Sequence, residues 1–161
     1  MLEKKLDFWL KNNLNVMLIG HKGCGKTTVI RDCFNRNNIN YLYFSASTMD
    51  PALDFLGVPK EVKCGDGTSY LDFVRPKYVN DDIEAIYLDE YNRSDKKLRN
   101  AVMELIQFKS INGKKFPKLR VVWTAINPDD ENNEYDVEKL DPAQIDRFHI
   151  HVSMPYTPNY I

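Results

Sequence analysis

Apolar and polar positions form blocks along the chain that predict strands and helices in turn. Short apolar runs predict buried strands, and longer stretches with apolar residues every three or four positions predict helices. The pattern predicts strands at 16–19, 41–45, 83–90, 119–126 and 148–152, and helices at 1–10, 26–37, 50–57, 94–108 and from Pro142. Because strands alternate with helices, we expect an α/β fold whose central parallel sheet is covered on both faces.

Two segments depart from this regular alternation. Residues 58–82 show no clear period: they contain a turn signal at 65–67, followed by 70–79, which could be a strand or an irregular insertion. Asn112-Gly113 is the strongest short hairpin signal in the chain and separates 108–111 from 114–116.

The residues from Gly20 to Thr27 match the pattern G-x-x-x-x-G-K-[ST], which is typical of loops that bind nucleoside triphosphates. Glycines let successive backbone N–H groups turn toward phosphate oxygens, and the positive end of the following helix adds to the attraction. The alternative is a glycine-rich turn with an exposed lysine, although the strand before the loop and the helix after it favour the first interpretation. The residues expected to contact the nucleotide are Gly20, His21, Lys22, Gly23, Cys24, Gly25, Lys26, Thr27 and Thr28.

Two side chains of this loop carry distinct chemistry. Lys26 offers a positive charge for the β- and γ-phosphates of ATP, and Thr27 offers a hydroxyl ligand for Mg²⁺, a cation that prefers oxygen. We interpret Cys24 as a small side chain that is tolerated in the loop rather than as a redox switch.

Further candidate residues follow the predicted strands of the sheet, where open α/β sheets bind ligands. Asp89 and Glu90 end one apolar strand, so that Asp89 can hold Mg²⁺ while Glu90 points toward an attacking water. Asn127 ends another strand, and Arg147 follows the short helix from Pro142. Each has a simpler explanation: an acidic pair that caps a strand, a turn asparagine before proline, and an ion-paired surface arginine.

Together these motifs resemble the AAA+ ATPases, and among them the MoxR-type branch. The resemblance covers about residues 15–155 and is carried by the stretches 20–27, 88–93, 124–128 and 140–148, in that order. It implies a three-layer αβα P-loop NTPase sandwich with a central parallel sheet. The chain departs from the family pattern at His21-Lys22, where relatives commonly have two prolines, and at Cys24, where they have threonine.

The resemblance also implies a role for each candidate. Lys26 and Thr27 would bind phosphate and Mg²⁺, Asp89 would lie on the Mg²⁺ side, and Glu90 would activate water. Asn127 would sense the γ-phosphate, and Arg147 would complete the site of a neighbouring subunit, which Arg93 would also face. The hairpin at 112–113 and the stretch 65–79 match inserts that in this branch face the pore and the partner.

Composition excludes or disfavours several other classes of protein. The chain has 161 residues, which suits one domain, and a formal net charge of −1, which does not indicate a nucleic-acid surface. Its three cysteines are odd in number and lack a C-x-x-C spacing, so we expect neither a disulfide framework nor a zinc site, and a reducing, cytoplasmic location. No apolar run is long enough to span a membrane, and no signal peptide is recognisable.

The sequence therefore predicts an ATPase core domain spanning 1–161, with no segment assignable to the small helical lid of the family. We expect ATP and Mg²⁺ as cofactors, a homo-oligomeric ring, by analogy a hexamer, and an unknown protein substrate or adaptor. Two alternatives stay open: a nucleotide-gated scaffold with little hydrolysis, and a DNA-directed motor of the replication or restriction type.

Overall fold

A parallel sheet of five strands organises the protein, and its order is β2-β5-β8-β1-β9. The computed structural model describes residues 1–128 and 140–155. The strands are β1 (Val16–Ile19), β2 (Tyr41–Ser45), β5 (Ala85–Asp89), β8 (Val121–Ile126) and β9 (Ile150–Ser153). The prediction of a central parallel sheet is confirmed.

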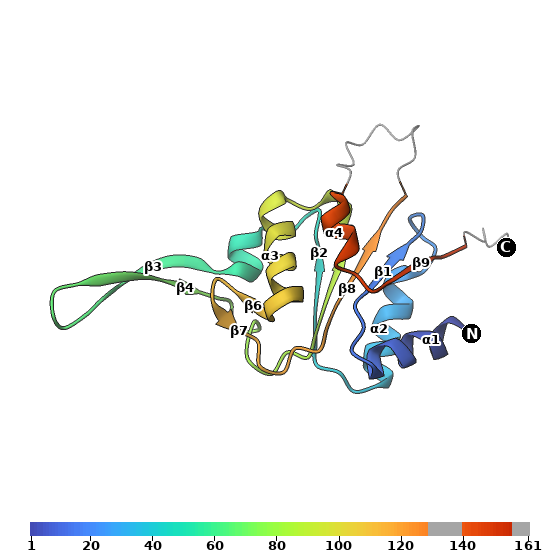
Figure 1. Cartoon of the computed structure of the whole chain (residues 1–161), viewed down its shortest axis with the longest axis horizontal. Helices are drawn as coiled ribbons and strands as arrows, with labels where there is room; N and C mark the ends of the chain where they lie inside the picture. Colours follow the sequence, from blue (N-terminus) through green and yellow to red (C-terminus); the bar gives the residue numbers. More distant parts are fainter. Residues whose placement is uncertain (129–139, 156–161) are drawn as a thin grey trace.

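Helices cover both faces of this sheet (Figure 1). One face carries α1 (Leu2–Lys11) and α2 (Lys26–Arg36), whose buried residues share a core with β1, β5 and β8. The other face carries α3 (Lys96–Phe108). The short helix α4 (Pro142–Asp146) lies on the same side, because its flanking residues Leu140 and Phe148 pack in the α3 core. The fold is thus the three-layer αβα sandwich of P-loop NTPases.

Alternation along the strands decides which core each side chain enters. On β5, Ala85 and Tyr87 pack in the core under α1 and α2, whereas Ile86 and Leu88 pack in the core under α3. Because side chains alternate along the strand, Asp89, at the end of β5, points to the same side as Tyr87 and thus toward α2. The strands are parallel, and their order therefore places the carboxyl ends of the three central strands, β5, β8 and β1, next to one another.

Two helices begin at side-chain caps that the sequence contains. The Asp95 carboxylate accepts a hydrogen bond from the Lys97 backbone N–H at 2.6 Å, which starts α3. Asp141 and Gln144 form a reciprocal capping box at the start of α4. Helix α2 begins differently, after Gly25 in a left-handed conformation with φ of 87°.

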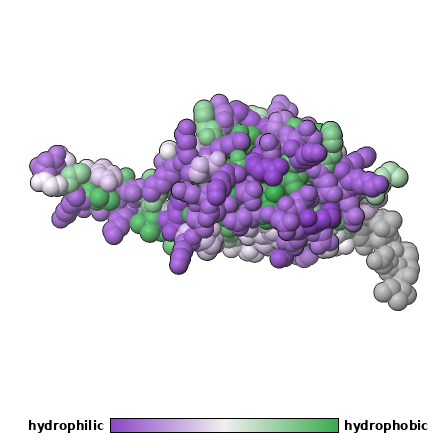
Figure 2. Space-filling model, turned by 90° about the horizontal axis from the view of Figure 1, so that it is seen from below, coloured by the Kyte–Doolittle hydropathy of each residue, from purple (hydrophilic) through white to green (hydrophobic). Residues whose placement is uncertain are grey.

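A two-stranded antiparallel hairpin projects from the body of the molecule (Figure 1). It consists of β3 (Val58–Lys63) and β4 (Ser69–Val74), and we call it the ribbon. The sequence left this segment open; the structure makes it a hairpin whose second strand ends at Val74 rather than Val79. Most of its apolar residues are exposed, with 70% of Leu71 and 55% of Tyr70 accessible, whereas Val62 and Phe73 are half-buried. Figure 2 shows hydrophobic atoms along the ribbon among hydrophilic ones.

A second, small hairpin lies against the base of the ribbon. Strands β6 (Ser110–Ile111) and β7 (Lys114–Lys115) flank Asn112 and Gly113, whose φ angles of 51° and 77° are both positive. These are the angles that a two-residue hairpin turn requires, so the prediction from Asn-Gly is confirmed.

Contacts between the two hairpins anchor the ribbon. The Lys114 ammonium donates to the Asp72 carboxylate at 2.7 Å and to the Phe73 carbonyl at 2.9 Å. The Arg75 guanidinium lies 4.8 Å from the centre of the Phe116 ring and donates to the Ile111 carbonyl at 2.8 Å.

Some predicted boundaries are wrong by a few residues. The strand expected at 83–90 is shorter, because Glu90 leaves it in a left-handed conformation and begins the turn η2 (Tyr91–Arg93). The helix expected at 50–57 is the five-residue π-helical turn η1 (Ala52–Leu56). The sequence also predicts a polar loop at 127–133, most of which lies outside the described residues. Among the described helices, none is both long and apolar enough to cross a membrane.

Candidate phosphate and metal site

The loop between β1 and α2 has the backbone that its glycines predict. Gly23 and Gly25 have φ angles of 84° and 87°, which side chains with a Cβ atom rarely adopt. Gly20 is constrained by space instead, because a Cβ atom there would lie 2.7 Å from the Cys24 sulfur. The loop is therefore shaped by three glycines for two different reasons.

The Lys26 side chain is buried at the centre of this loop, with 6% of the residue exposed. Its ammonium donates to the carbonyls of Gly20 at 2.6 Å and His21 at 2.9 Å, and to the Asn127 amide oxygen at 3.2 Å. All three acceptors are uncharged, and no described carboxylate lies within ion-pair distance of Lys26. A buried charge without a counterion is costly, so the arrangement favours an anionic ligand beside Lys26.

A second group of contacts joins α2 to the end of β5. The Thr27 hydroxyl donates to Asp89 Oδ2 at 2.5 Å and lies 3.3 Å from the Tyr87 hydroxyl. The other carboxylate oxygen of Asp89 accepts the Glu90 backbone N–H at 2.9 Å. Burial is the main cause that raises the pKa of Tyr87 above its usual range, followed by the charge of Asp89.

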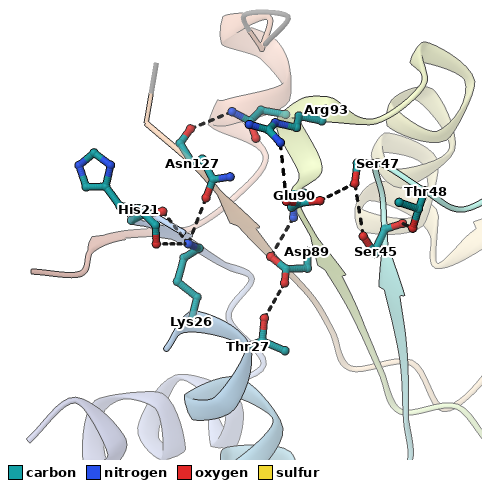
Figure 3. A network of polar contacts seen from close by, with 12 residues as sticks. His21, Lys26, Thr27, Ser45, Ser47, Thr48, Asp89, Glu90, Arg93 and Asn127 are labelled. Carbon is teal, nitrogen blue, oxygen red and sulfur yellow. Dashed lines mark hydrogen bonds and ion pairs between the residues drawn. The ribbon is translucent and has the colours of Figure 1, made fainter. Parts of the chain in front are cut away.

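Glu90 adopts a left-handed conformation with φ of 53°. Such angles are uncommon for residues other than glycine and often mark functional positions. One carboxylate oxygen accepts a hydrogen bond from the Ser47 hydroxyl, and the other lies 3.8 Å from the Arg93 guanidinium. Figure 3 shows the Glu90 side chain next to these two partners and above Asp89, with Lys26 to the left of both carboxylates.

Asn127 reaches the loop because β8 pairs with β1. The Gly20 N–H donates to the Ile126 carbonyl at 3.1 Å, which brings the next residue of β8 to the Lys26 ammonium. The Asn127 carbonyl accepts a hydrogen bond from the Asn92 amide at 2.8 Å, so the residue is held at both ends (Figure 3).

These residues surround a cavity of about 360 Å³. It is lined by Lys22, Gly23, Gly25, Lys26, Thr27, Thr28, Asp89, Glu90 and Asn127. The structure thus brings residues from three separate parts of the sequence to one space. A second cavity of about 560 Å³ is larger and is formed by residues 46–51 and 92–95. It is lined by Ser47 and Arg93 but lacks the glycine loop and the buried lysine.

The donor set suits Mg²⁺ bound together with a triphosphate. Thr27 and Asp89 offer oxygen ligands, which Mg²⁺ prefers. The described residues contain no cluster of three or more His, Cys, Asp or Glu side chains that could hold a metal alone. A Mg²⁺ ion at this place would take its other ligands from phosphate oxygens and water, as is usual for this cation.

Four of the predicted residues do not line this cavity. The Gly20 and His21 carbonyls accept hydrogen bonds from the Lys26 ammonium instead of facing the cavity. The Cys24 sulfur lies 3.8 Å from the same ammonium. Arg147 ends α4 and donates to the Gln107 side chain at 3.2 Å. It is therefore not a member of this chain's own phosphate cavity.

The fold and this loop together define a P-loop nucleotide-binding protein. The family model of the AAA ATPases ("ATPase family associated with various cellular activities") matches residues 16–156, and the chain belongs to that family. It is 26% identical over 157 residues to a curated protein of Thauera aromatica named "Putative chaperone BssE". The match covers 92% of this chain but 53% of that protein, so the chain spans about half the length of this relative.

Solved structures support the fold. A "putative ATPase" from Cytophaga hutchinsonii superposes with a TM-score of 0.60 at 20% identity, over 99% of this chain and 46% of that one. NtrX from Brucella abortus, solved in complex with ADP, superposes with a TM-score of 0.60 at 16% identity, over 96% of this chain and 34% of that one.

Sequence reasoning missed three residues that contact the predicted site. Ser47 and Asn92 could be found only once the strand order was known, because their partners are 43 and 35 residues away. Tyr87 had a local signal: it precedes Asp89 by two positions in a strand and so shares its face.

Proposed function

We propose that this domain binds Mg·ATP in the 360 Å³ cavity and hydrolyses it. The observation that carries the proposal is the buried Lys26 ammonium, which has only uncharged partners among the described residues. Phosphate oxygens are the anions that a glycine-lined loop at a helix N-terminus binds best. Membership of an ATPase family supports ATP as the ligand.

Each polar residue of the cavity has a role in this proposal. Lys26 holds the β- and γ-phosphates, and Thr27 and Asp89 hold the Mg²⁺ side. A Mg²⁺ ion held by Thr27 and Asp89 would supply positive charge next to the phosphates. Glu90 orients and deprotonates a water molecule, and Asn127 contacts the γ-phosphate while its amide oxygen fixes Lys26. Both carboxylate oxygens of Glu90 have a protein partner, and each keeps a further lone pair that can accept a hydrogen bond from water.

We further propose that the domain works in a ring of identical subunits, by analogy six, as a MoxR-like AAA+ module. Arg147 lies outside its own cavity, half-buried at the end of α4, so that a guanidinium placed there can serve a neighbour. An arginine supplied in this way is worth about 10³–10⁵ in rate in other phosphoryl-transfer enzymes. A monomer would then hydrolyse ATP poorly.

A protein is the partner that we propose for remodelling. The ribbon exposes Leu71, Tyr70 and Val74, which favours contact with apolar groups. Two of the nearby lysines, Lys114 and Lys118, are paired with Asp72 and Asp82, which reduces the positive charge of this surface. A DNA-directed motor is therefore less well supported, and stimulation of turnover by DNA would favour it.

A nucleotide-gated scaffold is the second candidate. The partners of Glu90 favour it, because a carboxylate held by Ser47 and Arg93 supports binding without hydrolysis. Turnover per subunit, measured against protein concentration, separates the two. A rate that rises with concentration supports the ring ATPase, and binding without turnover at every concentration supports the scaffold.

The decisive experiment measures nucleotide affinity by calorimetry for the wild type and Lys26→Met. Methionine keeps the length of the side chain and removes its charge. We expect the affinity for Mg·ATP to fall at least about 100-fold, because several charge-assisted hydrogen bonds are lost. Lys115→Ala, at an exposed position in the small hairpin, is the control and should bind as the wild type does. Equal affinities for the wild type and Lys26→Met would refute the proposal.

A further inference from the structure

The Thr27 hydroxyl has two protein partners, Asp89 at 2.5 Å and Tyr87 at 3.3 Å. A hydroxyl group has one hydrogen to donate and two lone pairs that accept. An ionised carboxylate only accepts, so the Thr27 hydrogen goes to Asp89. The Tyr87 O–H must then be the donor in the second contact, and it occupies one of the two lone pairs of Thr27.

One lone pair of the Thr27 oxygen is left after these two contacts. Thr27 lines the 360 Å³ cavity, and its two partners both lie on β5. A hydroxyl held by a donor and an acceptor cannot rotate without losing one of them. The remaining lone pair therefore has a fixed direction.

The fold places Tyr87 under this site for a simple reason. Tyr87 and Asp89 are two positions apart on β5 and face α2, whose second residue is Thr27. No part of Tyr87 is exposed, and its ring centre is 5.5 Å from that of Tyr43. A phenylalanine would fill the same space, so core packing does not require the hydroxyl.

We propose that Tyr87 is a positioning residue for the metal side of the site, because its hydroxyl orients Thr27 so that the free lone pair meets a divalent cation bound with the nucleotide. This inference rests on the proposed binding of Mg·ATP. It gives a role to the buried Tyr87 hydroxyl, which belongs neither to the loop at 20–27 nor to the acidic pair at 89–90. Tyr87 itself does not touch the cation; it acts through Thr27.

The test compares Tyr87→Phe with Tyr43→Phe. Both remove one phenolic oxygen from the same pair of neighbouring rings, but the Tyr43 hydroxyl has no hydrogen-bond partner among the described residues. Calorimetry measures ATP affinity with Mg²⁺ and again with EDTA in its place. We expect Tyr87→Phe to weaken binding about three- to tenfold with Mg²⁺, the effect of one hydrogen bond, and to leave binding in EDTA unchanged. Tyr43→Phe should match the wild type in both conditions.

A double-mutant cycle adds a readout that packing alone would not change. Thr27→Val removes the oxygen that Tyr87 orients, so Tyr87→Phe should have no further effect in that background. An equal loss from Tyr87→Phe in the wild-type background and in the Thr27→Val background would overturn the inference. So would a loss that is the same with Mg²⁺ and with EDTA, because it would report packing and not metal orientation.

The two proposals fail in different ways. If Lys26→Met binds ATP as the wild type does, the nucleotide site itself is wrong. If Lys26→Met abolishes binding while Tyr87→Phe and Tyr43→Phe are indistinguishable, the nucleotide site stands and only the role of Tyr87 is overturned.

Discussion

The phosphate cavity and the ribbon differ in which side chains they bury and in how these side chains are held. Around the cavity, the polar side chains of Lys26, Thr27 and Asp89 are buried or half-buried and have partners from other parts of the chain. Along the ribbon, apolar side chains such as Leu71 are exposed, and the contacts that hold it lie at its base. The cavity is thus shaped before a ligand arrives, whereas the ribbon exposes apolar side chains to solvent.

The two regions also depend on different sources of stability. The cavity lies at the end of β5, between two apolar cores. An isolated two-stranded hairpin is marginally stable in water, and the ribbon depends on the small hairpin beside it. Changes near the cavity should therefore affect function or global stability, and changes in the ribbon should have local effects.

The largest difference is expected in catalysis. Glu90→Gln keeps the shape of the side chain but removes the base, so ATP turnover should fall about 10²–10⁴-fold while Mg·ATP affinity stays near that of the wild type. Leu71→Ser, in the ribbon, should leave both values unchanged in the absence of a partner. Turnover and calorimetry on the two variants check this contrast.

A mixing experiment controls for assembly. Glu90→Gln retains Arg147, and Arg147→Ala retains Glu90, so a mixture of the two inactive variants should regain part of the turnover if Arg147 acts on a neighbouring subunit. A mixture as inactive as its components would contradict action between subunits.

A smaller difference is expected in stability, and two leucines offer a matched pair. Leu88 is fully buried next to Asp89, whereas 70% of Leu71 is exposed. Leu88→Ala should lower the free energy of unfolding by about 2–5 kcal/mol, and Leu71→Ala should change it by less than about 0.5 kcal/mol. Urea unfolding followed by circular dichroism measures both, and similar losses would mean that the ribbon belongs to the folded core.

The smallest effect is expected when acid breaks the contact between Lys114 and Asp72 that anchors the ribbon. The hydrogen bond that Lys114 donates holds the pKa of Asp72 below the ordinary value of 3.8. The contribution of this contact is thus fully present above pH 3.8 and is lost as the pH falls through the lowered pKa of the folded state. A nitroxide on Cys64, the exposed cysteine at the ribbon tip, should become more mobile over that range in a background lacking Cys24. Asp72→Asn should show the mobile signal already at neutral pH.

The sequence predicted the backbone of the phosphate loop and of the small hairpin because their signals are local. The loop from Gly20 to Thr27 and the Asn112-Gly113 turn each owe their shape to a few adjacent residues. Strand β3 was missed for the converse reason: Pro59 interrupts it and five of its six residues are exposed, so no apolar alternation is left to read. The partners of Glu90 were also hidden, because contacts between Ser47 and Glu90 depend on β2 lying next to β5.

Helix α3 joins the two regions. It starts at Lys96, three residues after Arg93, which contacts Glu90, and ends at Phe108, beside the small hairpin that anchors the ribbon. A helix of 13 residues is about 20 Å long and rigid on that scale. A tilt of about 5° at its first turn would displace its last turn by roughly 2 Å over that length. A rigid helix of this length therefore amplifies motion. A small shift beside Arg93, at the start of α3, would become a larger displacement beside the small hairpin at its end.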